Sequence, residues 1–513
     1  MRVLCLFLLM AGWSVVLTGT AHAKWHRATT PHFVIYANED AAKLHDRATR
    51  LEKVRQAVHL LRKVKDYPPG EGNRLTVFVV EDLSHVQRML RAPDPGISGY
   101  YRGRASGPVM LVPRWMGVWR KGQPTPETVF FHEYAHHLLL QDLKHPLPQW
   151  LSEGFAEFVG QARFTTVGGI AVGHFPRHRQ FGLTQAFEVP LDRLLTGNYV
   201  RLDSDQVENL YARGWLLYHY LNFEPTRRGQ LDRYLTALAS GDEPLRAAVT
   251  AFGDFKKLEK DLTAYARRPK LHYIQIPATK LKTSPIAIRP LSPAETDILP
   301  LHIELKVGAS ERAARRLAWQ AKSIANRYAS DHFVQLAVAE MELQAKNAEA
   351  AEVAADRALQ ANPRSTQAMI VKGRAIMERA AAGKLPAKAW NDARRWIMAA
   401  NKIDTEDPEP LVLFHESFER QGLAPTPDAV AALHYALALA PQDQHLRLKS
   451  AVQHLRQGKL AEAKRTLIPI AWHPHRKGAA ASARELMKLI NEGKMREAVQ
   501  LTAHNPPEEV EGH

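Results

Sequence analysis

The spacing of apolar positions in the first part of the chain changes between that of a strand and that of a helix. Residues 33–36 predict a short strand, and apolar residues from 44 to 61 then recur every three or four positions, which predicts a helix. Further strands are predicted at 75–80, 98–101 and 108–112, the last two on either side of a turn-like segment. This order of elements predicts an α+β domain.

Helical spacing dominates the next segment. Thr125 and Pro126 are typical of an N-cap and a first helical position, and they precede an apolar run that reaches Leu138. Another helix is predicted to begin near Leu151, and several more between 205 and 266. The segment 168–187 has no pattern that assigns it to either state.

The amino-acid composition changes in the second half of the chain. Residues 268–308 are rich in proline and β-branched residues, which predicts a connector with a small strand pair of its own. Beyond it, the chain is alanine-rich and predicted to be almost wholly helical.

The helical half is repetitive. Small-residue helices closed by a proline recur at 351–363, 393–408 and 429–441, and Pro408, Pro441 and Pro474 follow one another at steps of 33 residues. This spacing resembles the tetratricopeptide repeat, in which helix pairs stack into a solenoid. The aromatic positions of that repeat are mostly missing, so an unspecified helical solenoid is the alternative.

The first residues differ in kind from the rest. Arg2 precedes an apolar run from Val3 to Val16 and a small-residue ending at Ala23, which predicts a signal peptide cleaved after Ala23. A retained membrane anchor is the alternative, but the run is short for a span. Cleavage removes Cys5, the single cysteine, so the mature chain has no disulfides. We therefore expect an exported chain without a stable membrane span, in a bacterial periplasm or secreted.

The charge balance is basic but gives no sign of a nucleic-acid partner. The chain has 69 Lys and Arg against 53 Asp and Glu, a formal net charge of +16. These residues are scattered along predicted helices rather than gathered in a block with aromatic residues between them. Nucleic-acid binding is not expected.

One predicted helix contains a motif of metal ligands and a proton acceptor. His132, Glu133 and His136 form an H-E-x-x-H motif, and four residues turn a helix by about 400°, so both imidazoles project from nearly one side and can share a zinc ion. Glu133 lies beside that metal, where it can accept a proton from water. His137 is rotated off this face, so we expect it to be a supporting or capping residue rather than a ligand.

A resemblance supplies the third ligand. The segment Trp150-Leu151-Ser152-Glu153-Gly154-Phe155-Ala156 resembles the W-L-x-E-G-[FILM]-A element of gluzincin metallopeptidases, and is similar to the peptidase MA-like family of exported bacterial proteins. The resemblance covers roughly residues 25 to 265. It implies a zincin-like fold and one zinc ion held by His132, His136 and Glu153, with the fourth position left for water or substrate.

The same resemblance suggests supporting residues. In related gluzincins a carboxylate one turn after the ligand orients a histidine, which makes Glu157 the candidate here, against the alternative of a surface glutamate. Gluzincins of the aminopeptidase type also place a tyrosine on a later helix as oxyanion donor. Tyr211 is preferred for this role, while Tyr218 shares its helix face and core packing explains both tyrosines equally well.

Together these observations predict an exported zinc metallopeptidase in which a zinc-activated water attacks the peptide bond and Glu133 carries the proton. Its substrate is a peptide or protein, and a protein partner can bind the helical repeats. The alternatives are a repeat scaffold with an inactive peptidase domain, and hydrolysis of a non-peptide amide. The expected divisions are a signal peptide at 1–23, the peptidase domain at 24–267, the connector at 268–308, repeats at 309–503 and a polar tail at 504–513.

Overall fold

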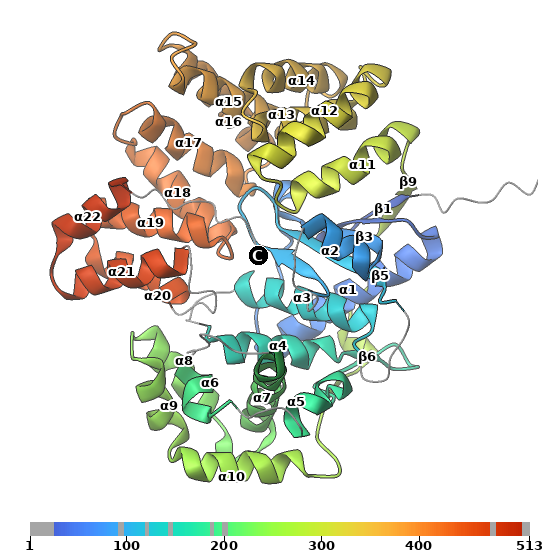
Figure 1. The fold of residues 1–513 in the computed structure, drawn as a ribbon, viewed down its shortest axis with the longest axis vertical. Helices are drawn as coiled ribbons and strands as arrows, with labels where there is room; N and C mark the ends of the chain where they lie inside the picture. Colours follow the sequence, from blue (N-terminus) through green and yellow to red (C-terminus); the bar gives the residue numbers. More distant parts are fainter. Residues whose placement is uncertain are drawn as a thin grey trace, which may run out of the picture.

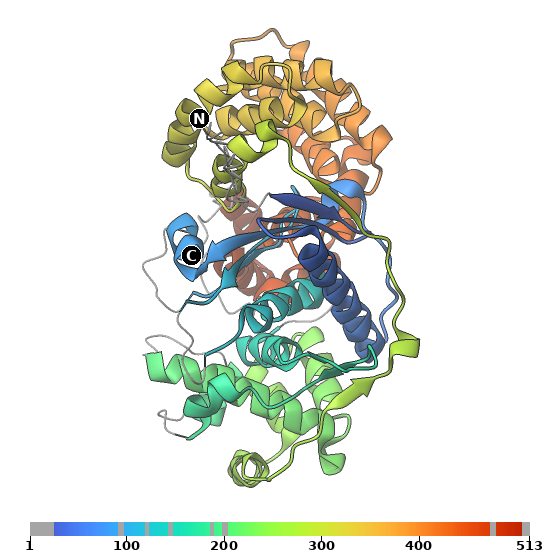
Figure 2. The ribbon, with the colours of Figure 1, turned by 90° about the vertical axis from the view of Figure 1, so that its right-hand side faces the viewer.

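The computed structural model describes residues 25–90, 97–117, 123–141, 147–184, 189–196, 204–471 and 479–504. The predicted signal peptide and nearly all of the predicted polar tail lie outside these residues, as do Pro474 and the helix end expected there. The described chain is an α+β protein with a small mixed sheet and a long run of helices (Figures 1 and 2), which confirms the fold class at that level.

The main sheet has six strands in the order β4-β5-β3-β2-β1-β9. β2, β3 and β5 are parallel, whereas β4, β1 and β9 each run antiparallel to their neighbours. The strands are β1 (His26–Thr29), β2 (Phe33–Ala37), β3 (Leu75–Asp82), β4 (Tyr100–Arg102), β5 (Val109–Trp115) and β9 (Ala287–Pro290). The predicted strands are confirmed. β4 is one edge of the sheet, and β5 lies inside it.

Alternate residues of β3 enter two different cores. Val77 and Val79 belong to the core shared with the long helices α1 (Ala41–Arg62) and α3 (Pro126–Gln141). Phe78 and Val80 face the opposite side, in a core with α2 (Leu83–Leu90) and α11 (Pro293–Lys306). Successive side chains of β3 therefore point to opposite faces of the sheet, and helices cover both faces.

The remaining helices of the first half lie beyond α3 (Figure 1). Two of them, α4 (Gln149–Gly160) and α7 (Ser204–Phe223), pack closely against each other, and α4 also packs against α3. The others are α5 (Gln180–Thr184), α6 (Leu191–Thr196), α8 (Gln230–Ala239), α9 (Pro244–Phe252) and α10 (Phe255–Ala266). A second sheet, in the order β6-β7-β8, consists of Arg163–Phe164, Ile170–Val172 and Ile274–Ile276.

The helical half curves around one side of the first half, and α20 returns to contact α8 (Figure 1). Its helices pack mainly on their neighbours in sequence. They are α12 (Glu311–Arg327), α13 (His332–Gln344), α14 (Ala348–Ala361), α15 (Thr366–Ala381), α16 (Ala389–Ile403), α17 (Pro408–Arg420), α18 (Pro427–Leu439), α19 (Gln444–Arg456), α20 (Leu460–Ala471), α21 (Ala479–Asn491) and α22 (Met495–His504).

The segment 268–308 corrects one expectation. Its strands do not pair with each other, because β8 pairs with β7 and β9 pairs with β1. Helix α11 also lies within it, and Ser292 and Glu295 form a capping box at its start. The strands find partners in the first half because the edges of both of its sheets offer unpaired backbone groups. This segment therefore completes the α+β part as well as leading out of it.

Across the described residues, no helix combines the length and the apolar character that crossing a membrane requires.

Candidate metal centre

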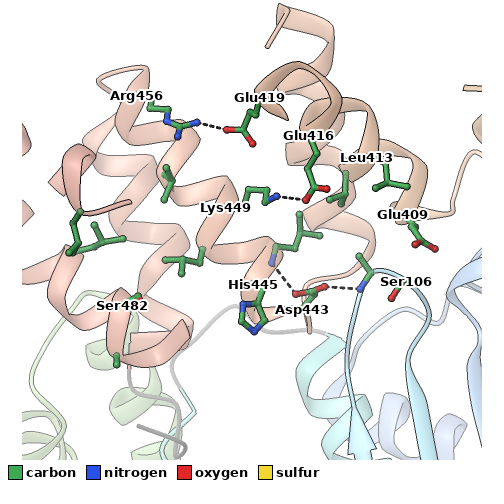
Figure 3. Close-up of a pocket in the computed structure, with 18 of the residues that line it drawn as sticks. Ser106, Glu409, Leu413, Glu416, Glu419, Asp443, His445, Lys449, Arg456 and Ser482 are labelled. Carbon is green, nitrogen blue, oxygen red and sulfur yellow. Dashed lines mark hydrogen bonds and ion pairs between the residues drawn. The ribbon is translucent and has the colours of Figure 1, made fainter. Parts of the chain in front are cut away.

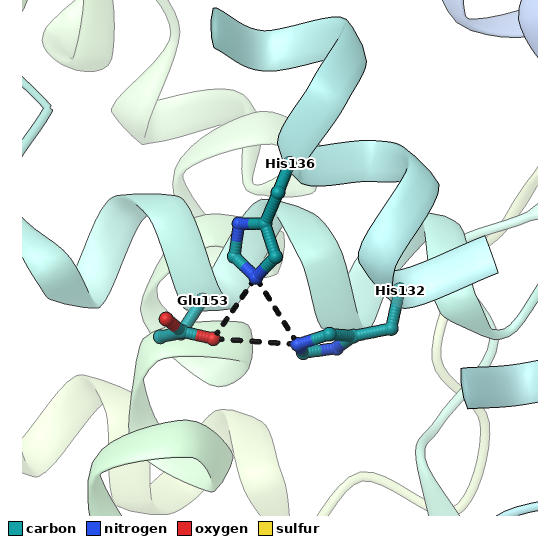
Figure 4. Close-up of side chains that lie close together, drawn as sticks. All are labelled: His132, His136 and Glu153. Carbon is teal, nitrogen blue, oxygen red and sulfur yellow. Dashed lines mark hydrogen bonds and ion pairs between the residues drawn. The ribbon is translucent and has the colours of Figure 1, made fainter. Parts of the chain in front are cut away.

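Helix α3 presents the two predicted histidines on one side. Its start is fixed as expected, since Thr125 Oγ1 accepts a hydrogen bond from the backbone nitrogen of Thr128 at 3.1 Å. From there the helix runs unbroken through the motif, and Phe130, Phe131 and Tyr134 are buried in the core behind it. His132 and His136 are one turn apart and point toward α4 (Figure 4).

Glu153 on α4 completes a triangle with these histidines (Figure 4). The Nε2 atoms of His132 and His136 are 3.2 Å apart. Glu153 Oε2 lies 3.4 Å from the His132 nitrogen and 3.5 Å from the His136 nitrogen. In the part of the chain that the structure describes, this is the one group of three or more His, Cys, Asp or Glu side chains with the spacing of metal ligands.

The dimensions of the triangle fit a tetrahedral metal ion. Atoms about 2.0–2.1 Å from a tetrahedral centre are about 3.3–3.4 Å from one another, close to all three measured edges. Glu153 is only 8% exposed, and among the described residues its Oε2 has no hydrogen-bond partner. A buried carboxylate oxygen without a donor is costly unless a ligand satisfies it. The residues therefore fit a metal held by two nitrogens and one oxygen.

Each of the two histidines has a polar neighbour at its second ring nitrogen. His136 Nδ1 lies 3.2 Å from Ser152 Oγ, and His132 Nδ1 lies 3.5 Å from Glu157 Oε1. Glu157 is 1% exposed, so it is not the surface glutamate of the alternative reading. Such contacts fix the orientation of a ligating imidazole.

Glu157 is in turn fixed by two side chains that precede α5, Arg179 and His178. Arg179 donates to Glu157 Oε1 at 2.8 Å and to Glu208 Oε1 at 2.7 Å, and His178 Nε2 lies 3.0 Å from Glu157 Oε2. Arg179 also lies over the ring of Tyr211, at 4.4 Å from its centroid. Sequence patterns did not predict these contacts, since both side chains come from the unassigned segment 168–187.

The structure separates the two candidate tyrosines. The ring of Tyr211 lies 6.1 Å from that of His132, whereas the ring of Tyr218 packs on Phe155 and Phe158 at 5.8 and 5.3 Å. Tyr211 therefore borders the triangle of His132, His136 and Glu153, which we call the metal triangle. Tyr218 packs with two core phenylalanines.

Two glycines bring Tyr211 to this position. A methyl group added at Gly214 would lie 2.6 Å from the backbone oxygen of Trp150, and one added at Gly154 would collide with the backbone of Gly214. Helices α4 and α7 therefore cross backbone to backbone at these glycines. Gly214 is three residues after Tyr211, so Tyr211 lies about one helical turn from the contact between Gly214 and Gly154. The crossing of the two helices therefore holds Tyr211 opposite Glu153.

Glu133 lies between the triangle and the edge of the main sheet. A methyl group added at Gly99 would lie 2.8 Å from Glu133 Cγ and 2.8 Å from Val129 Cγ1. The chain just before β4 thus passes directly over Glu133, and only glycine leaves room for it. Gly99 is a further residue that sequence patterns did not single out.

His137 faces away from the triangle, as expected. It is 2% exposed, its Nδ1 lies 3.0 Å from the hydroxyl of Tyr101, and its ring stacks on Tyr134. Burial lowers the pKa of His137 well below the usual value, so it is neutral. Its role is to pack α3 against β4.

The charges of the site favour a bound cation. Burial disfavours the charged form of His136, but Glu153 outweighs this and raises the pKa of His136 to about 8. Burial would raise the pKa of Glu153, yet the imidazoles of His136 and His132 hold that pKa below its usual range. Burial raises the pKa of Glu133, which makes its carboxylate a better proton acceptor. Glu153 and burial both raise the pKa of Tyr211, so its hydroxyl remains a donor.

No family model matches this sequence, and no curated protein matches it. The assignment of a metal centre therefore rests on the geometry of His132, His136 and Glu153 and on the two sequence motifs that contain them.

Proposed function

We propose that this chain is an exported zinc-dependent metallopeptidase, with a gluzincin-like domain and tetratricopeptide-like repeats that bind a substrate or partner. The observation that carries the proposal is the triangle of two imidazole nitrogens and one carboxylate oxygen with tetrahedral edges. Two neutral imidazoles and one carboxylate are the donor set of catalytic zinc sites. Zinc would be held by His132, His136 and Glu153.

When bound, zinc supplies Lewis acidity that activates water and polarises a carbonyl group. The other steps belong to side chains. Glu133, whose pKa is raised by burial, accepts the proton of the attacking water and delivers it to the departing amine. Tyr211 donates its hydroxyl hydrogen to the carbonyl oxygen as negative charge develops there. Glu157 keeps His132 in its ligating orientation.

The position of β4 suits an extended peptide. β4 is an edge strand, and the chain at its start passes over Glu133. A peptide that pairs with an edge strand places its backbone in a regular register, and backbone hydrogen bonds hold it without regard to sequence. This favours a peptide over a non-peptide amide as substrate.

The test is zinc content and proteolysis in the same preparation. The purified chain is expected to contain one zinc ion and to cleave a denatured protein, and Glu133→Gln is expected to keep the zinc and lose roughly 10²- to 10⁴-fold in rate. Cleavage that survives in Glu133→Gln rules out the mechanism. Bound zinc without cleavage in either form favours the alternative of a binding scaffold.

A further inference from the structure

A cavity of about 690 Å³ lies in the helical half, between α17, α19 and α21 (Figure 3). Part of its lining is apolar, with Leu413, Leu446, Leu448, Val452 and Leu486. Its size is within the range of sites that bind small ligands or peptide side chains.

One wall of the cavity comes from the other half of the chain. Ala105 and Ser106, in the turn between β4 and β5, line it together with the helices (Figure 3). The backbone nitrogen of Ala105 donates to Asp443 Oδ2 at 2.8 Å. The side chain of Ala105 is buried in a cluster with Leu411, Leu446 and other residues of the helical half. The hairpin is thus built into the cavity wall.

The same hairpin begins beside Glu133. Gly99 lies against Glu133, and Ala105 is six residues further along the chain. Six extended residues span at most about 20 Å, so the cavity and the triangle are close neighbours along one hairpin. A peptide with one segment in the cavity can therefore reach Glu133 along β4 with only a few more residues.

The lining has more negative than positive side chains. Lys449 pairs with Glu416 and Arg456 pairs with Glu419, as Figure 3 shows, and Arg374 lies 3.2 Å from Glu409. The carboxylates of the lining are Glu409, Glu416, Glu419, Asp443 and Glu485, and its lysine and arginine side chains are Arg374, Lys449 and Arg456. The two remaining carboxylates are Asp443, whose oxygens accept hydrogen bonds from the backbone nitrogens of Ala105 and Leu446, and Glu485, which is exposed. The lining therefore has more negative than positive charge in a chain whose formal net charge is +16, and Glu485 is the carboxylate that an added cation can reach.

We propose that this cavity binds a segment of the peptide substrate that carries basic and apolar side chains, and that the adjoining residues extend along β4 to the metal triangle. The proposal rests on the proposed peptidase function and names the class of its substrate. Apolar side chains enter the leucine-lined part of the cavity, and a lysine or arginine side chain meets Glu485.

Binding is tested first, with the full mature chain carrying Glu133→Gln so that no probe is cleaved. The probes are two fluorescein-labelled peptides, one of alternating leucine and lysine and one of alternating leucine and glutamate. The leucine–lysine peptide is expected to bind and the other is not, and added salt is expected to weaken binding. Equal binding of the two peptides would overturn the proposal.

A charge reversal locates the site. Glu485 lines the cavity and is exposed, so Glu485→Lys is not expected to disturb folding, and it should weaken binding of the leucine–lysine peptide roughly tenfold. The matched control is Glu349→Lys, the same change at an exposed position of α14 outside the cavity lining. If both reversals have the same effect, binding reflects overall charge and the proposal fails.

Cleavage is tested second, with Glu133 intact. Each of the two peptides is joined to a randomised tail, and products are identified by mass spectrometry. At low concentration the leucine–lysine library is expected to be cut faster, and Glu485→Lys should remove this difference, whereas Glu349→Lys should preserve it. Equal cleavage of both libraries by the unmodified chain overturns the proposal and leaves the peptidase function intact. Specific binding with no cleavage of either library instead overturns the peptidase function.

Discussion

Two regions of the molecule, the metal triangle and the contact between α11 and α13, treat a carboxylate beside a histidine differently. Between α13 and α11, Glu340 Oε2 lies 2.8 Å from His302 Nε2, and its other oxygen accepts from Lys306 at 2.8 Å. In the metal triangle, Glu153 Oε2 stands 3.4 Å from His132 Nε2 and 3.5 Å from His136 Nε2. The first distance is that of a direct charge-assisted hydrogen bond, and the second is too long for one.

The difference separates a structural pair from a ligand site. Side chains that only need each other close to hydrogen-bond distance, because this compensates the cost of burying them. The atoms of Glu153, His132 and His136 instead keep the separations expected of ligands around one ion. The pair between α11 and α13 shows that this chain closes such contacts where nothing else has to fit between them.

Substitution of Glu153 should produce the largest effect. Glu153→Gln replaces a charged ligand with a neutral amide, so we expect zinc affinity to fall by more than the roughly 10- to 100-fold typical of outer-shell changes. A competition titration with a chelator measures it. Glu340→Gln, the same change at the closed pair, should leave zinc affinity unchanged. Equal affinities of the Glu153 variant and the unmodified chain would show that the triangle is not the metal site.

The two tyrosines of α7 provide the next contrast. Tyr211→Phe should lower kcat on the order of 10²-fold with little change in KM or zinc content, because it removes a donor that acts only as charge develops. Tyr218→Phe removes the same atom from a ring that packs on Phe155 and Phe158, and should leave kcat unchanged. If the two variants lose activity equally, Tyr211 has no special place in the reaction.

How much of this site the sequence predicted depends on how far apart its parts lie in the chain. His132 and His136 follow from the pitch of a single helix, and their positions on α3 agree with it. Glu153 required a resemblance, since nothing in the spacing of a second helix says where it docks. Ser152 and Arg179 were missed, because only the packing of α4 and of the segment before α5 against α3 brings them to the histidines.

The fold follows the same rule. The strands with apolar runs were predicted, whereas β1 was not, because His26–Thr29 lacks an apolar pattern of its own and is a strand only through its pairing with β2 and β9. β9 lies where a strand pair was expected, but its partner is β1 rather than a strand of the same segment. The cavity also had no sequence signal. It forms where helices far apart in the chain meet the β4–β5 turn.

Asp407 is also buried, but its carboxyl group differs from those of Glu153 and Glu340 in its protonation. Burial, and then the neighbouring Glu409, raise the pKa of Asp407 to about 8, so the folded chain keeps it protonated at neutral pH. The unfolded chain ionises it near pH 4, so this residue stabilises the fold fully only below that pH, and the contribution is lost as pH rises to about 8.

The neutral variant Asp407→Asn should remove this dependence. Between pH 5 and pH 8 the unmodified chain is expected to lose about 3 kcal/mol of stability relative to Asp407→Asn, measured by urea unfolding at each pH. The variant retains an oxygen for the backbone nitrogen of Glu409, which now bonds Asp407 Oδ1 at 3.0 Å. Parallel stability curves would mean that Asp407 is ionised in the folded chain.

A smaller loss of zinc affinity than that of Glu153→Gln should come from Glu157, which resembles Glu340 in its partners. Each carboxylate contacts a histidine and one longer cationic side chain, Arg179 or Lys306, and in each the pKa is held low. The substitutions Glu157→Gln and Glu340→Gln should therefore both destabilise the fold, since each removes the negative charge from an ion pair. Only Glu157→Gln should also weaken zinc binding, by about 10- to 100-fold, because Glu157 alone of the two orients a ligand. If both variants weaken zinc binding equally, the loss follows from stability, and the contact between Glu157 and His132 does not tune the metal.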